Sequence, residues 1–249
     1  MKKIKLILAA LAAVLAFSAL ATCLSAADAA TVETKAKALK SLGLFRGVSD
    51  TEFDLDRSPT RVEALVMLIR TLGNEKEATG GNWKHPFSDV PSWADKYVGY
   101  AYEKGLTKGV SDTEFGTGNA SAATYVTFML RALGYSDSAG DFSWKDPFGL
   151  AKTAGILPDT VDLEDFLRAD VVEISFSALK AKIKDSKDTL GDRLISMGAF
   201  TANDLKLATT LAPGGGRQIF VRDPNPAILP VEPKDPLLPM DDDGPAIGD

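Results

Sequence analysis

The heptapeptide GVSDTEF occurs twice in this chain, at residues 47–53 and again at residues 109–115. Two further pairs keep almost the same spacing, since RTLG at 70–73 returns as RALG at 131–134 and WKHPF at 83–87 returns as WKDPF at 144–148. The three shifts are 62, 61 and 61 residues. A nearly constant shift across separate matches indicates internal duplication, and such repeats stack on one another to bury a common core.

Each repeat is expected to form a helix, a glycine-containing loop and a second helix. In the middle unit, Trp93, Tyr97 and Tyr100 fall on one helical face behind the expected N-cap Ser92, and Ser121 is expected to cap the second helix. No segment shows the alternation of a strand, so we predict an all-α fold of three helix-loop-helix repeats packed as a pseudo-threefold, three-lobed bundle. The other expected helices cover residues 32–42, 60–72, 148–154, 168–183 and 187–197.

The chain is expected to divide into five parts. Residues 1–29 form a secretory signal peptide, with an early lysine cluster, an apolar run over residues 6–20 and an A-x-A site at 27–29. Residues 201–249 form a disordered, extended Pro/Gly-rich tail, because eight of the thirteen prolines lie from Pro213 onward. Between them lie the three repeats, at residues 30–74, 83–135 and 142–200, the last with a closing helix.

The apolar run at the N-terminus is too short for a membrane span, which needs about 20 apolar residues. Cleavage after Ala29 would remove Cys23, the only cysteine, and leave an exported chain without disulfides. One alternative stays open, because the residues from Leu20 to Cys23 loosely match a lipobox and would leave Cys23 acylated.

The composition excludes several functional classes. With 28 basic and 34 acidic residues, the net charge of −6 argues against nucleic acid as a partner. A single histidine, His85, gives no zinc-ligand set and little basis for catalysis. The carboxylates near Asp54 lack the spacing of a calcium loop. We therefore expect a protein that is not an enzyme and has no metal or cofactor.

The order of the motifs resembles the S-layer homology family, whose units read roughly F-x-D-V-x-x-x-W-A, G-x-x-x-G, D-x-x-F and T-R-A-E. The middle unit matches from Phe87 to Phe115, the first carries TRVE at residues 60–63, and the third carries LRAD at residues 167–170. This resemblance covers about residues 32–184. It implies a secreted protein of a Gram-positive-type cell surface, anchored non-covalently to a secondary cell-wall polysaccharide. It also implies an acidic sugar ligand, typically with a pyruvate ketal, bound in grooves between neighbouring repeats.

The resemblance and the residues together point to candidate binding positions. Thr60 and Glu63 form an expected capping box, which places Arg61 on the first helical turn, where a cation opposes the helix dipole but suits a carboxylate ligand. The middle unit has Ala122 at this position and lacks the charge. The predicted carbohydrate-binding residues are Arg61, Arg168, Asp89, Trp93 and Gly109.

Alternatives to these roles stay open. Arg61 could instead pair with Asp54 or Asp56, Trp93 could belong to the core, and Asp89 could cap the turn that follows it. At the level of function, the alternative is a non-catalytic assembly protein that contacts other surface proteins through the three-lobed body. The C-terminal tail is a second candidate for such contacts.

Overall fold

A computed structural model gives the structure of residues 32–49 and 52–211. The expected signal peptide, Cys23 and the chain beyond residue 211 lie outside these described residues. Across the described part of the chain, no helix combines the length and apolar character that a membrane crossing requires.

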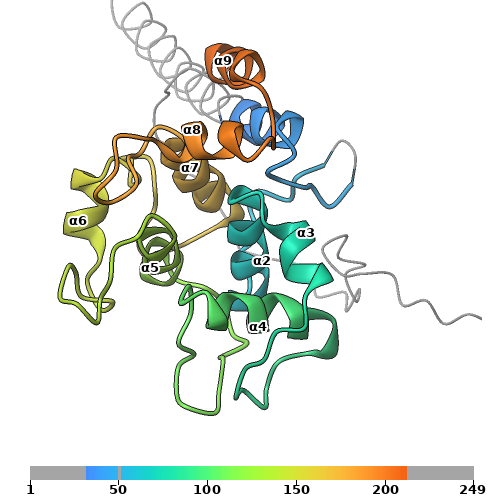
Figure 1. Cartoon of the computed structure of the whole chain (residues 1–249), viewed down its shortest axis with the longest axis vertical. Coiled ribbons are helices and arrows are strands. Elements are labelled where there is room, and N and C mark those ends of the chain that lie inside the picture. The colour runs from blue at the N-terminus through green and yellow to red at the C-terminus, as the bar shows by residue number, and fades with distance from the viewer. Residues whose placement is uncertain (1–31, 50–51, 212–249) are drawn as a thin grey trace, which may run out of the picture.

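Three helices of 11 residues each form the centre of the molecule (Figure 1): α2 (Arg61–Thr71), α5 (Ala122–Ala132) and α7 (Arg168–Ala178). They are the second helices of the three repeats, and each contacts the other two. Ten of the eleven residues of α2 and of α7 are buried, and seven of the eleven of α5, which fits helices that are enclosed by the rest of the fold. In the described ranges the regular structure is entirely helical, with only isolated β-bridges besides, so the all-α prediction is confirmed. The three-lobed outline stays a prediction.

The first helices of the repeats lie outside this centre. They are a helix over residues 32–41, the pair η1 (Ser92–Ala94) and α4 (Asp95–Glu103), and α6 (Phe148–Thr153). Ser92 makes no side-chain capping bond, so its expected role as an N-cap is wrong. The chain instead forms a 3₁₀ turn there, in which Ala94 N donates to Pro91 O at 2.9 Å.

Two expected helix boundaries also need correction. Helix α7 ends at Ala178 rather than at residue 183. The next amides bond to carbonyls three residues earlier, as in a 3₁₀ turn, and Lys182 then forms an isolated β-bridge with Thr189. The closing helix, α8 (Leu190–Ser196), begins after Thr189, whose side chain accepts from Asp192 N at 3.1 Å. A further short helix, α3 (Glu75–Gly80), was not predicted from the sequence.

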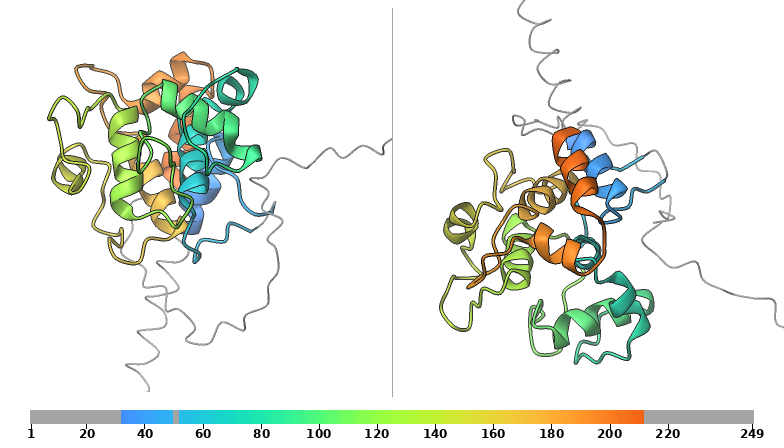
Figure 2. Two further views of the ribbon diagram at one scale, coloured as in Figure 1. Left: turned by 90° about the horizontal axis from the view of Figure 1, so that it is seen from below. Right: turned by 45° about the horizontal axis from the view of Figure 1, so that its top comes forward.

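The expected extended tail does not begin at residue 201, because α9 (Ala202–Leu211) occupies its first part. Thr201 Oγ1 accepts from Asp204 N at 3.2 Å and Asp204 Oδ2 accepts from Thr201 N at 2.9 Å, which is the reciprocal bonding of a helix start. Figure 2 shows α9 beside the helix at residues 32–41, so the two ends of the described chain meet.

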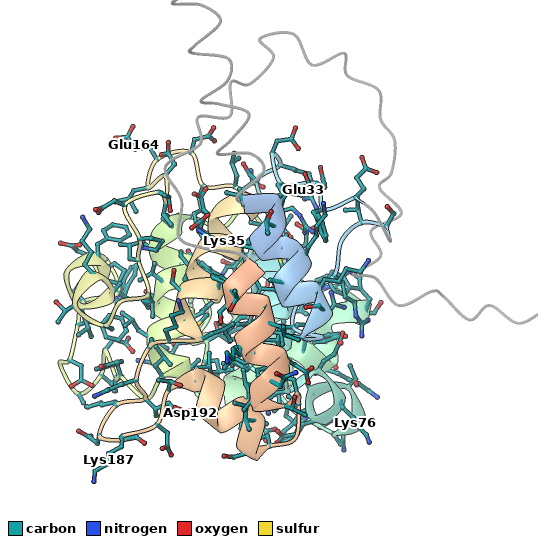
Figure 3. All side chains as sticks on the ribbon, turned by 90° about the horizontal axis from the view of Figure 1, so that it is seen from above. Glu33, Lys35, Lys76, Glu164, Lys187 and Asp192 are labelled. Atoms are coloured by element: carbon teal, nitrogen blue, oxygen red, sulfur yellow. The ribbon has the colours of Figure 1, made fainter. Side chains whose placement is uncertain are left out.

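A buried ion pair joins the first repeat to the third. Lys35, labelled in Figure 3 on the helix at residues 32–41, places its Nζ 2.8 Å from Glu173 Oε2 on α7. Thr160 Oγ1 donates to the same carboxylate at 3.0 Å. Because both charged side chains are almost fully buried, this pair holds the N-terminal helix in one position against the core.

Candidate functional site

The first two repeats meet where the N-terminus of α2 contacts the loop at residues 116–120, a contact that we call the Arg61 joint. Arg61 N donates to Gly118 O at 2.8 Å, and Ala120 N donates to Pro59 O at 2.9 Å. These bonds satisfy one of the free amides of the first helical turn. They also set the second repeat's loop beside the Arg61 side chain.

The predicted capping box at the start of α2 is confirmed. Thr60 Oγ1 accepts from Glu63 N at 3.2 Å, and Glu63 Oε2 accepts from Thr60 N at 2.7 Å. Arg57 adds two bonds to the same carboxylate, at 2.8 and 3.0 Å. The backbone at Arg61 is therefore held from both sides.

The Arg61 guanidinium lies between two aromatic rings of the second repeat. Its Cζ lies 5.2 Å from the ring centre of Phe115 and 5.0 Å from that of Phe128, within the range of cation–π attraction. Nη1 lies 3.4 Å from Thr124 Oγ1, while Nε is buried and has no hydrogen-bond partner among the described residues. Neither alternative pairing, with Asp54 or with Asp56, is among the ion pairs of the described residues, and Asp54 instead lies 2.7 Å from Arg57 Nε.

The surroundings of Arg61 leave its charge poorly compensated. Burial and the nearby Arg131 lower the pKa of Arg61 to about 10, although Asp89 attracts the charge in the opposite direction. The guanidinium still carries its charge at neutral pH. A carboxylate brought to it would supply both a counter-charge and hydrogen-bond acceptors.

Asp89 holds the loop that carries Phe115. Its Oδ1 accepts from Phe115 N at 2.7 Å and its Oδ2 from Gly116 N at 2.8 Å. Burial alone would raise the pKa of Asp89, but these two backbone hydrogen bonds, together with a bond from its own amide and the nearby His85, bring the pKa below its ordinary value. Asp89 therefore positions the ring that packs on Arg61.

Gly109 and Trp93 also have identifiable contacts. Gly109 has φ +75°, and a Cβ there would lie only 2.4 Å from Phe87 Cε1, so the loop needs glycine at this point. Trp93 is partly buried against the hydrophobic core. These contacts explain both residues through packing, and their binding roles remain predictions.

The third and first repeats meet in the same way, at a contact that we call the Arg168 joint. Arg168 N donates to Arg57 O at 2.9 Å, and the side-chain Nε lies 3.3 Å from Phe53 O. The guanidinium lies 5.8 Å from the ring centre of Phe45. Unlike Arg61, Arg168 has no exposed surface and belongs to the core.

At the contact between the second and third repeats, which we call the third joint, Ala122 stands where the other two joints have an arginine. Ser121 caps α5 as predicted, accepting from Thr124 N at 3.2 Å, and is followed by the buried Ala122. The ring of Phe166, from the third repeat's loop, packs against Tyr125 with the ring centres 6.1 Å apart.

A polar hollow of about 570 Å³ beside the Arg61 joint was not predicted from the sequence. The group of carboxylates near Asp54 is the sequence signal that corresponds to it. One repeat supplies most of the lining and the next repeat supplies the rest, so the hollow lies where an inter-repeat groove was expected. Its lining residues are Asp54, Asp56, Arg57, Ser58, Thr60 and Asn119.

Comparison with known proteins agrees with this organisation. Residues 86–120 match the S-layer homology domain. The chain is 32% identical, over 84% of its length, to a cell surface protein of Thermoanaerobacter kivui. It is 31% identical over 54% of its length to the middle cell wall protein of Brevibacillus brevis, and 33% identical over 53% to a surface layer protein of Brevibacillus choshinensis.

These matches cover only part of each relative, 29%, 14% and 12% of their lengths respectively. The matched domain spans the second repeat from Pro86 to Ala120, and so includes Asp89, Gly109 and Phe115. The first and third repeats are not matched individually. The chain therefore carries an S-layer homology domain and is similar to bacterial cell-surface and surface-layer proteins.

Proposed function

We propose that this chain anchors itself non-covalently to the bacterial cell wall by binding an acidic, pyruvylated secondary wall polysaccharide between its repeats. It does so as a non-enzymatic protein, without a cofactor. The carboxylate of a pyruvate ketal is a small, fixed anion, which suits a guanidinium held in one orientation.

The observation that carries this proposal is the state of Arg61. Its guanidinium is partly buried against the rings of Phe115 and Phe128 and keeps an unpartnered Nε. The preceding residue, Thr60, lines a polar hollow that two repeats share. A cation on the first turn of a helix opposes the helix dipole and adds little to stability there. An anionic ligand would relieve this unfavourable placement.

Sedimentation with purified sacculi tests the proposal. Sacculi from a Gram-positive bacterium with a pyruvylated wall polysaccharide should retain the full chain, and sacculi stripped of that polysaccharide should not. Arg61→Gln should weaken retention about ten- to a hundredfold, which is the range expected for losing one charge-assisted contact. A thermal melt of each variant separates lost binding from lost folding.

Arg46→Gln is the matched control, because it removes the same charge from an exposed side chain that pairs with Glu75. Retention of this variant should equal that of the wild type. If stripped sacculi retain the chain as well as intact ones, wall-polysaccharide binding is excluded. The alternative, assembly with other surface proteins, would then become the leading function.

A further inference from the structure

We infer that the chain binds a single acidic sugar per molecule, at the Arg61 joint alone. This inference rests on the proposed wall-binding function and assigns the sugar-binding site to one of the three related joints. The three joints have a common origin in the repeat, and their differences decide the number of sites.

The Arg61 and Arg168 joints share one backbone arrangement. In each, the first amide of a central helix donates to a carbonyl of the neighbouring repeat's loop, Gly118 O at 2.8 Å in one and Arg57 O at 2.9 Å in the other. Phe115 and Phe53, the last residues of the two copies of the heptapeptide, lie against the two arginines. The joints are therefore two versions of the same structure.

Side chains close one version and leave the other open. The loop of the Arg61 joint has Gly116 and Gly118 at six and four residues before its own central helix, α5. The loop of the Arg168 joint has Leu55 and Arg57 at the same distances before α2. Leu55 packs against the core, and its carbonyl accepts a second backbone bond, from Ala169 N at 3.0 Å. Gly116 has φ +85°, and a Cβ there would lie 2.8 Å from Val110 Cγ1 and 3.6 Å from Arg61 Cδ, so this position beside the arginine holds no side chain.

The exposure of the two arginines follows from this difference. Arg168 is 0% exposed and lies among Phe45, Phe53 and Met67, where a sugar has no access. Arg61 remains partly exposed. At the third joint, Ala122 offers no cation, so a carboxylate would gain nothing there.

Calorimetric titration of the full chain counts the sites directly. The probe is a monosaccharide with a pyruvate ketal, and the same sugar without the ketal is the reference. We expect one molar equivalent to bind, at least tenfold weaker binding to Arg61→Gln, and no measurable binding of the reference sugar.

Gly118→Leu tests whether the glycine keeps the joint open. A Cβ at Gly118 would meet no atom within 4 Å, so the substitution should leave the melting temperature unchanged while reducing affinity at least tenfold. Gly149→Leu is the control, since Gly149 is equally unobstructed but lies on α6. Its affinity should equal that of the wild type.

The outcomes separate the two proposals. Two bound equivalents, or unchanged affinity in both Arg61→Gln and Gly118→Leu, would overturn the single-site inference and leave wall binding standing. If the wild-type chain binds neither the ketal sugar nor intact sacculi, the proposed function fails and the inference fails with it.

Discussion

The phenol oxygen of Tyr125 on α5 lies 2.6 Å from Ser175 Oγ on α7, and that oxygen lies 3.3 Å from Thr71 Oγ1 on α2. All three side chains are buried. One chain of hydroxyl groups thus connects the central helices of the three repeats. Because an unpaired buried hydroxyl is costly, this chain favours one mutual arrangement of the repeats over others.

Tyr125→Phe should destabilise the fold by about 1–3 kcal/mol, because it leaves Ser175 short of a partner in an interior that water does not reach. Equilibrium urea denaturation measures the change. Tyr102→Phe is the control, since Tyr102 is 41% exposed and water can replace its contacts. Equal effects for the two variants would show that the hydroxyl chain contributes nothing specific.

Lys35→Met should cost about 3–5 kcal/mol, because it leaves the Glu173 carboxylate buried without its counter-charge. Adding Glu173→Met should recover most of this loss, and the double-mutant cycle is read from denaturation midpoints. The exposed pair of Lys37 and Glu33 provides the comparison. Lys37→Met should cost less than about 1 kcal/mol. A loss of less than about 1 kcal/mol for Lys35→Met would contradict the expectation that Glu173 depends on Lys35 for its counter-charge.

Gly109→Ala should destabilise the chain more than Gly105→Ala does. Both glycines have positive φ, which costs an alanine about 1 kcal/mol or more. Only at Gly109 would the new Cβ also meet Phe87 and two carbonyl oxygens. Thermal melts of the two variants compare the costs directly. If they prove equal, packing against Phe87 is not what requires glycine at this position.

Stability should depend on the protonation of Asp170, which is buried at the start of α7 and accepts from Leu167 N and Asp162 N. Burial, reinforced by the charges of Asp162 and Glu173, outweighs these bonds and raises the pKa of Asp170 to about 7. An unfolded aspartate titrates near 4. The stabilisation of the folded state by protonated Asp170 is therefore complete below about pH 4 and is lost as the pH rises towards 7.

This sign predicts that the free energy of unfolding falls with pH in that window, by up to about 1.4 kcal/mol per pH unit. Urea denaturation at a series of pH values measures the slope. Asp170→Asn removes the titrating group and should flatten the profile between pH 4 and 7. A variant as pH-dependent as the wild type would assign the effect to other groups.

The helical repeats could be predicted from the sequence because their signals are local. The caps Thr60 and Ser121 lie at the starts of α2 and α5 as the sequence indicated. The same kind of signal was present but unused at Thr201 and Asp204, where α9 begins. Ser92 misled the prediction, since a residue type favoured at caps does not by itself decide between an α-helix and a 3₁₀ turn.

The sequence alone determined the repeat and the helical class, since periodicity and capping depend on near neighbours. It also determined that Arg61 and Arg168 lie on first helical turns. Only the tertiary structure decided that Arg61 stays partly exposed and that Arg168 lies in the core. Each arginine is covered or uncovered by a loop of another repeat, and Phe53 is 115 residues from Arg168 along the chain. Local sequence around an arginine cannot specify what a distant loop places over it.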